Sequence, residues 1–127
     1  MSYLKNRLKS MQHAANGIYL LLRNEPNAKI HLLCTTLVIC LSLLIELSTF
    51  EWSLIAFAIG MVFISEAFNS AIENLSDIVS PDYNKKIKVI KDLSAGGVLI
   101  SAIAAVAIAC LVLFPKIIEL VSKTFII

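Results

Sequence analysis

The sequence predicts an all-α integral membrane protein with three transmembrane helices and an N-terminal amphipathic surface helix. Of its 127 residues, 58% are apolar and only 16% are charged. A water-soluble domain of this length could not build its polar surface from that composition, so long apolar segments must face lipid. No repeat or linker separates these segments, and we expect residues 1–127 to form a single membrane domain.

Residues 3–22 have the pattern of a helix that lies on the membrane surface. Apolar side chains recur every three or four positions, beginning with Leu4 and Leu8, and basic and polar side chains occupy the opposite face. Such a helix lies in the interfacial layer instead of crossing it. Pro26 ends the pattern, because proline is suited to the first turn of a new helix.

We expect the three transmembrane helices at about residues 30–47, 52–79 and 93–114. The third has no charged residue and approaches the ~20 residues that cross a bilayer core. Pro115 is expected to mark its end. Small residues at every fourth position along this helix predict close packing against another helix; they are Gly97, Ser101, Ala105 and Ala109.

Positive charges are concentrated before the first span and in the loop at residues 85–91, whereas the short turn at residues 47–51 has none. The positive-inside rule therefore predicts that the N-terminus and the 85–91 loop are cytoplasmic. With three spans, the C-terminus is then expected outside. The net charge of +2 gives no reason to expect nucleic-acid binding.

The second span carries a polar stripe, made of Glu66, Asn69, Glu73 and Asp77. At ~100° per residue these side chains share one face of a helix within about a third of its circumference. Glu66 follows Trp52 by about 21 Å along the axis at ~1.5 Å per residue. If Trp52 marks the outer interface, Glu66 lies inside the hydrocarbon on the cytoplasmic side.

A carboxylate at that depth costs roughly 2.5–3.5 kcal/mol and is usually functional. Several carboxylates on one face repel one another unless a cation intervenes, and Mg²⁺ binds one or two carboxylates together with nucleotide phosphates. The polar stripe therefore suggests a cation site where a membrane-anchored substrate meets a water-soluble one. The alternative is a helix end whose acidic residues are solvated or paired with the lysines at 85–91.

Two motifs carry a family resemblance. The second span contains Glu66-Ala67-Phe68-Asn69-Ser70-Ala71-Ile72-Glu73 with Asp77 beyond it, and the third begins with Lys91-Asp92-Leu93-Ser94-Ala95-Gly96-Gly97. Together they resemble the prokaryotic diacylglycerol kinase family, with the pattern E-x-x-N-[ST]-A-I-E-x-x-x-D and a later A-K-D-x-[AG]. Ile90 replaces the usual Ala. The resemblance extends over about residues 7–114.

This resemblance implies an ATP-dependent lipid kinase that uses Mg²⁺ and phosphorylates the hydroxyl of a membrane lipid alcohol, either diacylglycerol or undecaprenol. His31 and the pair Glu51-Trp52 slightly favour the branch of this family that includes undecaprenol kinases. The resemblance also implies a homotrimer with active sites shared between subunits. That agrees with a simple consideration: three helices alone cannot enclose the polar stripe together with a nucleotide.

Residue by residue, the resemblance makes Glu66 the general base and makes Glu25 and Glu73 the metal ligands. The remaining matched positions would contact the nucleotide or support its site; they are Asn69, Asp77, Asp82, Tyr83, Asn84, Lys91, Asp92 and His13. Asn84 stands where the family usually has His, and a lone His on a surface helix, such as His13, better fits a plain interfacial role. No Walker-type P-loop is present to bind the phosphates.

Two other classes compete with a kinase. A small proton- or ion-coupled transporter subunit would also carry a glutamate inside the membrane. A structural membrane subunit would carry no activity at all. Neither class explains the motif at Lys91-Asp92.

Overall fold

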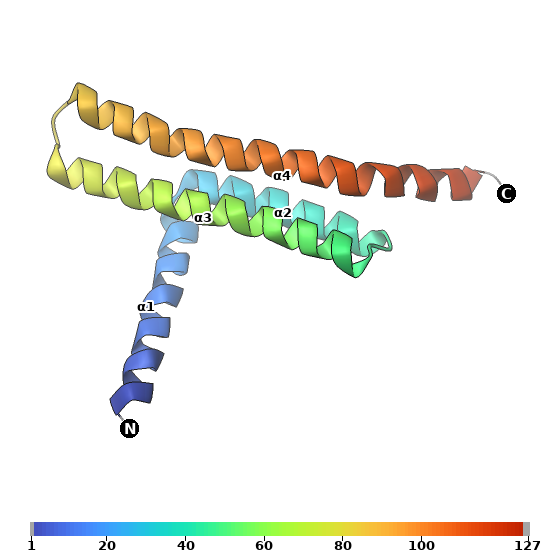
Figure 1. Ribbon diagram of the computed structural model, residues 1–127, viewed down its shortest axis with the longest axis horizontal. Helices are drawn as coiled ribbons and strands as arrows, with labels where there is room; N and C mark the ends of the chain where they lie inside the picture. Colours follow the sequence, from blue (N-terminus) through green and yellow to red (C-terminus); the bar gives the residue numbers. More distant parts are fainter. Residues whose placement is uncertain (1, 126–127) are drawn as a thin grey trace.

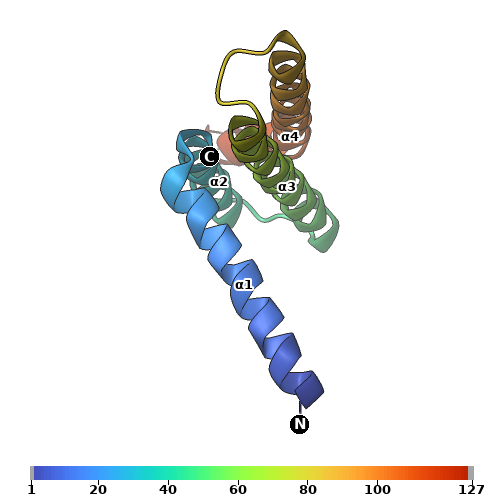
Figure 2. The same cartoon turned by 90° about the vertical axis from the view of Figure 1, so that its left-hand side faces the viewer.

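The computed structural model describes residues 2–125, which form four α-helices: α1 (Ser2–Asn24), α2 (Pro26–Leu44), α3 (Thr49–Val79) and α4 (Lys85–Phe125). Helices α2, α3 and α4 run side by side as a bundle, and α1 leaves that bundle at a steep angle (Figures 1 and 2). Helix α3 lies between the other two and packs against α4 along much of its length. It is therefore the element that both neighbours can reach.

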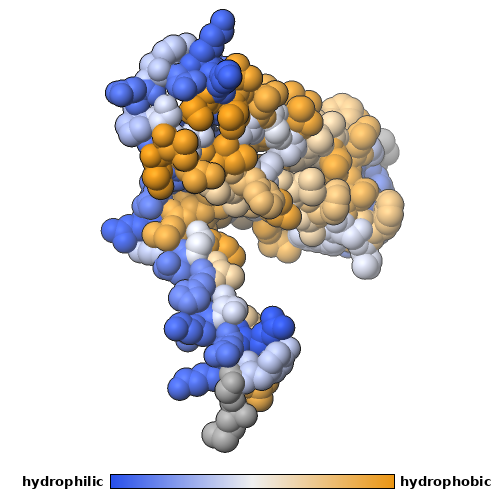
Figure 3. Space-filling model, turned by 60° about the vertical axis from the view of Figure 1, so that its left-hand side comes forward, coloured by the Kyte–Doolittle hydropathy of each residue, from blue (hydrophilic) through white to orange (hydrophobic). Residues whose placement is uncertain are grey.

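Three of these helices, α2, α3 and α4, are long and apolar enough to cross a membrane. Most of their large apolar side chains are exposed, as expected where lipid replaces water. Figure 3 shows apolar side chains over much of the visible face of the bundle, with polar side chains at one end and along α1. The predictions of an all-α fold and of three membrane-spanning helices are confirmed. The chain is a multi-pass membrane protein.

The ends of two helices differ from the prediction. Helix α2 begins at Pro26, because proline occupies the first turn and Glu25 is the residue that precedes the helix. Helix α4 begins at Lys85 and continues to Phe125, with Pro115 inside it. The expectation that Pro115 ends the last helix is therefore wrong.

The part of α4 beyond Pro115 lies beside Glu51 at the start of α3 and beside the turn between α2 and α3. A proline inside a helix costs about 3 kcal/mol, but helices in membranes tolerate it where neighbours compensate. Lys116 lies 3.8 Å from a carboxylate oxygen of Glu51, and Glu119 pairs with Lys123 at 2.7 Å within α4. The same stretch lines a cavity together with Ile45 and Glu46. The helix therefore continues past its proline where other parts of the chain lie next to it.

Small residues bring α3 and α4 together. The hydroxyl groups of Ser65 on α3 and Ser101 on α4 are 2.6 Å apart, and Gly97 and Ala105 face α3 across a shared cavity. Ala109 packs against an apolar cluster formed by Ile45, Ile55, Val112 and Leu113. The predicted close packing is confirmed at Ser101 and Ala109, whereas Gly97 is exposed and a Cβ at its position would have nothing within 4 Å.

A capping box starts α3 at the end that this apolar cluster occupies. The Ser48 backbone N–H donates to Glu51 Oε2 at 2.6 Å, and the Ser48 hydroxyl accepts from the Glu51 backbone N–H. Two N–H groups that the helix itself leaves unpaired are satisfied in this way. The cap therefore defines where the second membrane span begins.

We predict that Ser48→Ala lowers the free energy of unfolding by about 1 kcal/mol, because the N-cap side chain is lost. The measurement is unfolding in mixed micelles by titration with a denaturing detergent. Ser53→Ala is the matched control, since this exposed hydroxyl only bonds to the Phe50 carbonyl within the helix. Equal effects of the two substitutions would contradict the stabilising role of the cap.

Candidate active site

Glu66 is the most deeply buried charged residue that the structure describes, with 1% of its surface exposed. It lies on α3 beside a cavity of about 210 Å³ (the Glu66 cavity) that also borders α2 and α4. Its Oε2 atom is buried and has no hydrogen-bond partner within residues 2–125. A buried carboxylate oxygen without a partner is unfavourable, so this atom is available to a ligand that enters the cavity.

Asn69, one turn further along α3, is held in a single orientation. Its side-chain N–H donates to Glu73 Oε1 at 3.1 Å, and its Oδ1 accepts a short hydrogen bond from the Ser94 hydroxyl of α4. Only 5% of Asn69 is exposed. Both halves of the amide are thus engaged, and Asn69 fixes the position of the Glu73 carboxylate at the wall of the Glu66 cavity.

Glu25 reaches the same region from the start of α2. The Ser70 hydroxyl of α3 donates to Glu25 Oε1 at 2.6 Å. Glu25, His31 and Glu73 lie near enough to Glu66 to act on its carboxylate electrostatically. Glu25 and His31 precede Glu66 by 41 and 35 positions in the sequence, so the fold brings two other predicted site residues, Glu25 and Glu73, and one histidine to the buried carboxylate.

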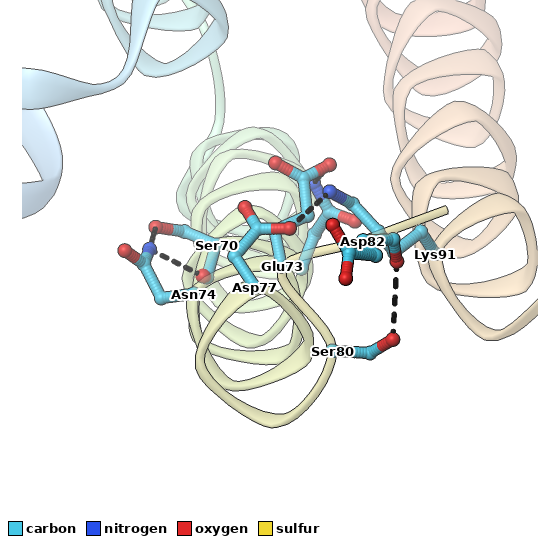
Figure 4. A network of polar contacts seen from close by, with 8 residues as sticks. Ser70, Glu73, Asn74, Asp77, Ser80, Asp82 and Lys91 are labelled. Carbon is cyan, nitrogen blue, oxygen red and sulfur yellow. Dashed lines mark hydrogen bonds and ion pairs between the residues drawn. The ribbon is translucent and has the colours of Figure 1, made fainter. Parts of the chain in front are cut away.

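A second cavity, of about 350 Å³, lies at the loop between α3 and α4 (the loop cavity). Five residues expected to contact nucleotide line it, together with Lys91; they are Asp77, Asp82, Tyr83, Asn84 and Asp92. Lys91 Nζ lies 2.9 Å from Asp77 Oδ1, so these two residues form an ion pair (Figure 4). Asp92 pairs with Lys88 on the exposed face of α4.

Asn84 has a local role that the sequence did not indicate, and His13 lies apart from both cavities. Asn84 caps α4, because its Oδ1 accepts from the backbone N–H groups of Lys86 and Ile87 at 2.9 and 3.4 Å. His13 is exposed on α1 and does not line either cavity. The structure thus brings the other predicted site residues to two adjoining regions but leaves His13 apart.

Ser70 and Ser94 were missed as supporting residues. A helical wheel could have indicated Ser70, since it lies about 40° from Glu66 at ~100° per residue. Ser94 lies on another helix, and only the packing of α4 on α3 shows what it bonds. No group of three or more His, Cys, Asp or Glu side chains in the described part of the chain is arranged to hold a metal ion by itself.

These features define a class: a small multi-pass membrane protein with a buried carboxylate between its helices and a polar cavity at one end of the bundle. Residues 12–113 match the family model described as prokaryotic diacylglycerol kinase. The chain belongs to this family.

Two curated relatives are similar over most of the chain. The undecaprenol kinase of Bacillus subtilis is 34% identical over 113 residues, which cover 89% of this chain and 92% of that protein. The diacylglycerol kinase of Synechocystis is 32% identical over 116 residues, which cover 91% of this chain and 66% of that protein. The protein is a lipid kinase with ATP as its co-substrate, and nothing supports the transporter alternative.

We predict that Ser94→Ala lowers the lipid kinase activity about 10-fold, because a buried acceptor that loses its donor costs about 1–3 kcal/mol. Asn69 would then no longer hold Glu73 in place. The measurement is transfer of labelled phosphate from ATP to lipid in detergent micelles. Ser122→Ala is the control, since this hydroxyl bonds only to the Glu119 carbonyl of its own helix. Full activity of Ser94→Ala would exclude this role.

Proposed function

We propose that the protein transfers the γ-phosphoryl group of Mg-ATP to the terminal hydroxyl of a membrane lipid alcohol, with undecaprenol as the first candidate. The unpaired Oε2 atom of Glu66 beside an open cavity is the observation that supports this most strongly. The similarity to undecaprenol kinase over nearly the full length of both chains supports the choice of lipid. Diacylglycerol is the second candidate, favoured by the other relative.

Glu66 is the proposed general base. A lipid hydroxyl that enters the Glu66 cavity would donate its hydrogen bond to Oε2, which relieves the buried, unpaired acceptor. As the bond from the hydroxyl oxygen to the γ-phosphorus forms, the bond from that phosphorus to the oxygen bridging it to the β-phosphate breaks, and ADP leaves with that oxygen. The hydroxyl proton passes to the carboxylate. Phosphoryl transfer also depends on positioning and on stabilisation of negative charge, so Glu66 would both orient the hydroxyl and accept its proton.

Glu25 and Glu73 are the proposed Mg²⁺ ligands. Their hydrogen bonds to Ser70 and Asn69 each use Oε1, and the second oxygen of each carboxylate is left out of these bonds. Two carboxylate oxygens suit Mg²⁺, which usually completes its coordination with water and nucleotide phosphates. When bound, Mg²⁺ would neutralise charge on the phosphates, and the residues around it would hold the two carboxylates at the required spacing.

The loop cavity is the proposed entry for ATP. Asp77 lies one helical turn beyond Glu73, so a nucleotide in this cavity would extend its phosphates toward the Glu66 cavity. Lys91 occupies the boundary, where its ammonium group faces both Asp77 and Glu73. We propose that Lys91 exchanges Asp77 for a phosphate oxygen, with Asp92 and the loop residues Asp82, Tyr83 and Asn84 around the nucleotide.

The proposed setting is a bacterial inner membrane with the loop cavity on the cytoplasmic side, where ATP is available. The lysines at 85–91 support this orientation by the positive-inside rule. Apolar side chains along α1, among them Leu4, Leu8 and Met11, are exposed, which suits a helix on the membrane surface. We further propose a homotrimer, whose neighbouring subunits would cover the open sides of the two cavities.

The test is a parallel assay of the purified protein with undecaprenol and with diacylglycerol in the same micelles. We expect Mg-ATP-dependent phosphorylation of undecaprenol at a higher kcat/KM than that of diacylglycerol. Glu66→Gln should lower the rate at least 100-fold, since general base catalysis contributes about 10²–10⁴-fold. Activity that persists in Glu66→Gln would contradict the proposed mechanism, and a preference for diacylglycerol would reverse the choice of lipid.

The metal ligands are tested by titration with Mg²⁺ at saturating ATP and lipid. We expect Glu25→Gln and Glu73→Gln to raise the Mg²⁺ concentration needed for half-maximal activity about 10-fold, which corresponds to ~1.4 kcal/mol of lost binding. Glu46→Gln, near the opposite end of the bundle, serves as the control and should leave the curve unchanged. An unchanged Mg²⁺ requirement in both variants would remove them from the metal site.

A further inference from the structure

His31 lies where two cavities of different character meet. It is half-buried on α2 and lines the Glu66 cavity. It also lines an apolar groove of about 270 Å³ between α2, α3 and α4, whose walls include Val38, Ile59 and Val106. Ile30 and His31 are the residues common to both linings, and His31 is the polar one of the two.

The proposed function requires a lipid to occupy both the Glu66 cavity and the apolar groove. A lipid alcohol with its hydroxyl beside Glu66 must extend its hydrocarbon chain toward apolar surroundings, and the groove provides them directly next to the Glu66 cavity. The carbon that carries the hydroxyl would then pass His31. The imidazole of His31 therefore lies between the place of the lipid's hydrocarbon chain and the place of its reacting hydroxyl oxygen.

Other polar side chains line the Glu66 cavity, but His31 is the one that also lines the groove. Asn69 donates one N–H to Glu73 and accepts from Ser94, and Asn27 is exposed and does not line the groove. His31 makes no hydrogen bond within the part of the chain that the structure describes. An imidazole ring carries at least one N–H donor in every protonation state, so His31 has a donor to offer to a ligand.

We propose that His31 positions the lipid hydroxyl by donating a hydrogen bond from its ring N–H to the hydroxyl oxygen, opposite the bond that this hydroxyl donates to Glu66. The inference rests on the proposed function of the Glu66 cavity. His31 is a positioning residue in this role, since it neither accepts the proton nor contacts the transferred phosphoryl group.

The geometry of an alcohol oxygen explains why a second partner is needed. Its four tetrahedral directions hold the carbon, the hydrogen and two lone pairs. Glu66 binds the hydrogen and the groove holds the carbon chain, but the hydroxyl could still rotate about its hydrogen bond. A donor on one lone pair fixes that rotation and directs the other lone pair toward the phosphorus. Orientation of this kind is a large part of catalysis when two reactants are brought together.

The experiment compares two substitutions of His31 in the micelle assay with lipid and Mg-ATP. His31→Leu has no donor, and we expect kcat to fall about 10- to 100-fold through loss of orientation, with the KM for Mg-ATP within 2-fold of the wild type. His31→Gln keeps an N–H donor on a side chain of similar length, and we expect it to recover at least 5-fold in kcat over His31→Leu. A purely structural role would not be restored by the amide.

Two controls separate this role from a loss of folding. Thr36→Val, on the exposed side of the same helix, removes a hydroxyl that bonds only to the Leu32 carbonyl and should leave kcat unchanged. If His31→Leu does not fold, His31→Met supplies a flexible apolar side chain without an N–H donor and carries the same expectation. Folding is followed by gel filtration and by the KM for Mg-ATP.

The outcomes are distinguishable from those of the proposed function. If the wild type phosphorylates lipid, Glu66→Gln is inactive and the donorless variants keep kcat within 3-fold of the wild type, the role of His31 is overturned and the proposed function stands. The same holds if His31→Gln is no better than His31→Leu. If the wild type phosphorylates neither lipid, the proposed function fails and the inference fails with it.

Discussion

The polar stripe of α3 is the constraint on which the rest of the structure depends. A carboxylate, an amide and hydroxyl groups within a membrane-spanning helix have no water to bond to, and each unsatisfied group is costly. The partners come from the neighbouring helices: Ser94 of α4 bonds to Asn69, and Glu25 at the start of α2 bonds to Ser70. These two hydrogen bonds therefore help to fix how α2 and α4 pack on α3, while Glu66 Oε2 has no partner within residues 2–125.

The polar stripe also has a buried end and an exposed end. Glu66 is buried among helices, whereas Asp77 and Lys91 form an ion pair at the loop end, where both side chains are partly exposed. Exposed ion pairs contribute little to stability, so Lys91 can exchange partners at small cost. Glu66 Oε2, a buried acceptor without a partner within residues 2–125, lies at the other end of the stripe, in a cavity that adjoins an apolar groove. The two ends of the stripe thus suit a lipid on one side and a soluble nucleotide on the other.

Much of the fold followed from local patterns, and the failures have physical causes. The three spans are confirmed, as is the close packing of Ser101 and Ala109 in α4, because apolar length and spacing are properties of one helix at a time. The expected end at Pro115 is wrong, because a proline is only a local signal and helices in membranes tolerate it where neighbouring elements lie beside them. Asn84 shows the opposite case, in which a residue matched to a family position also has a local role as a helix cap.

By itself the sequence determined that this is a membrane protein with three spans, that its second span carries an acidic stripe, and which family the motifs resemble. Periodicity and composition suffice for these conclusions, because they depend only on neighbours along the chain. Only the tertiary structure decided that Asp77 pairs with Lys91, that Ser70 and Ser94 hold Glu25 and Asn69, and that His31 stands between the Glu66 cavity and the groove. Such relations depend on how the helices rotate and slide against one another, which many weak side-chain contacts settle together.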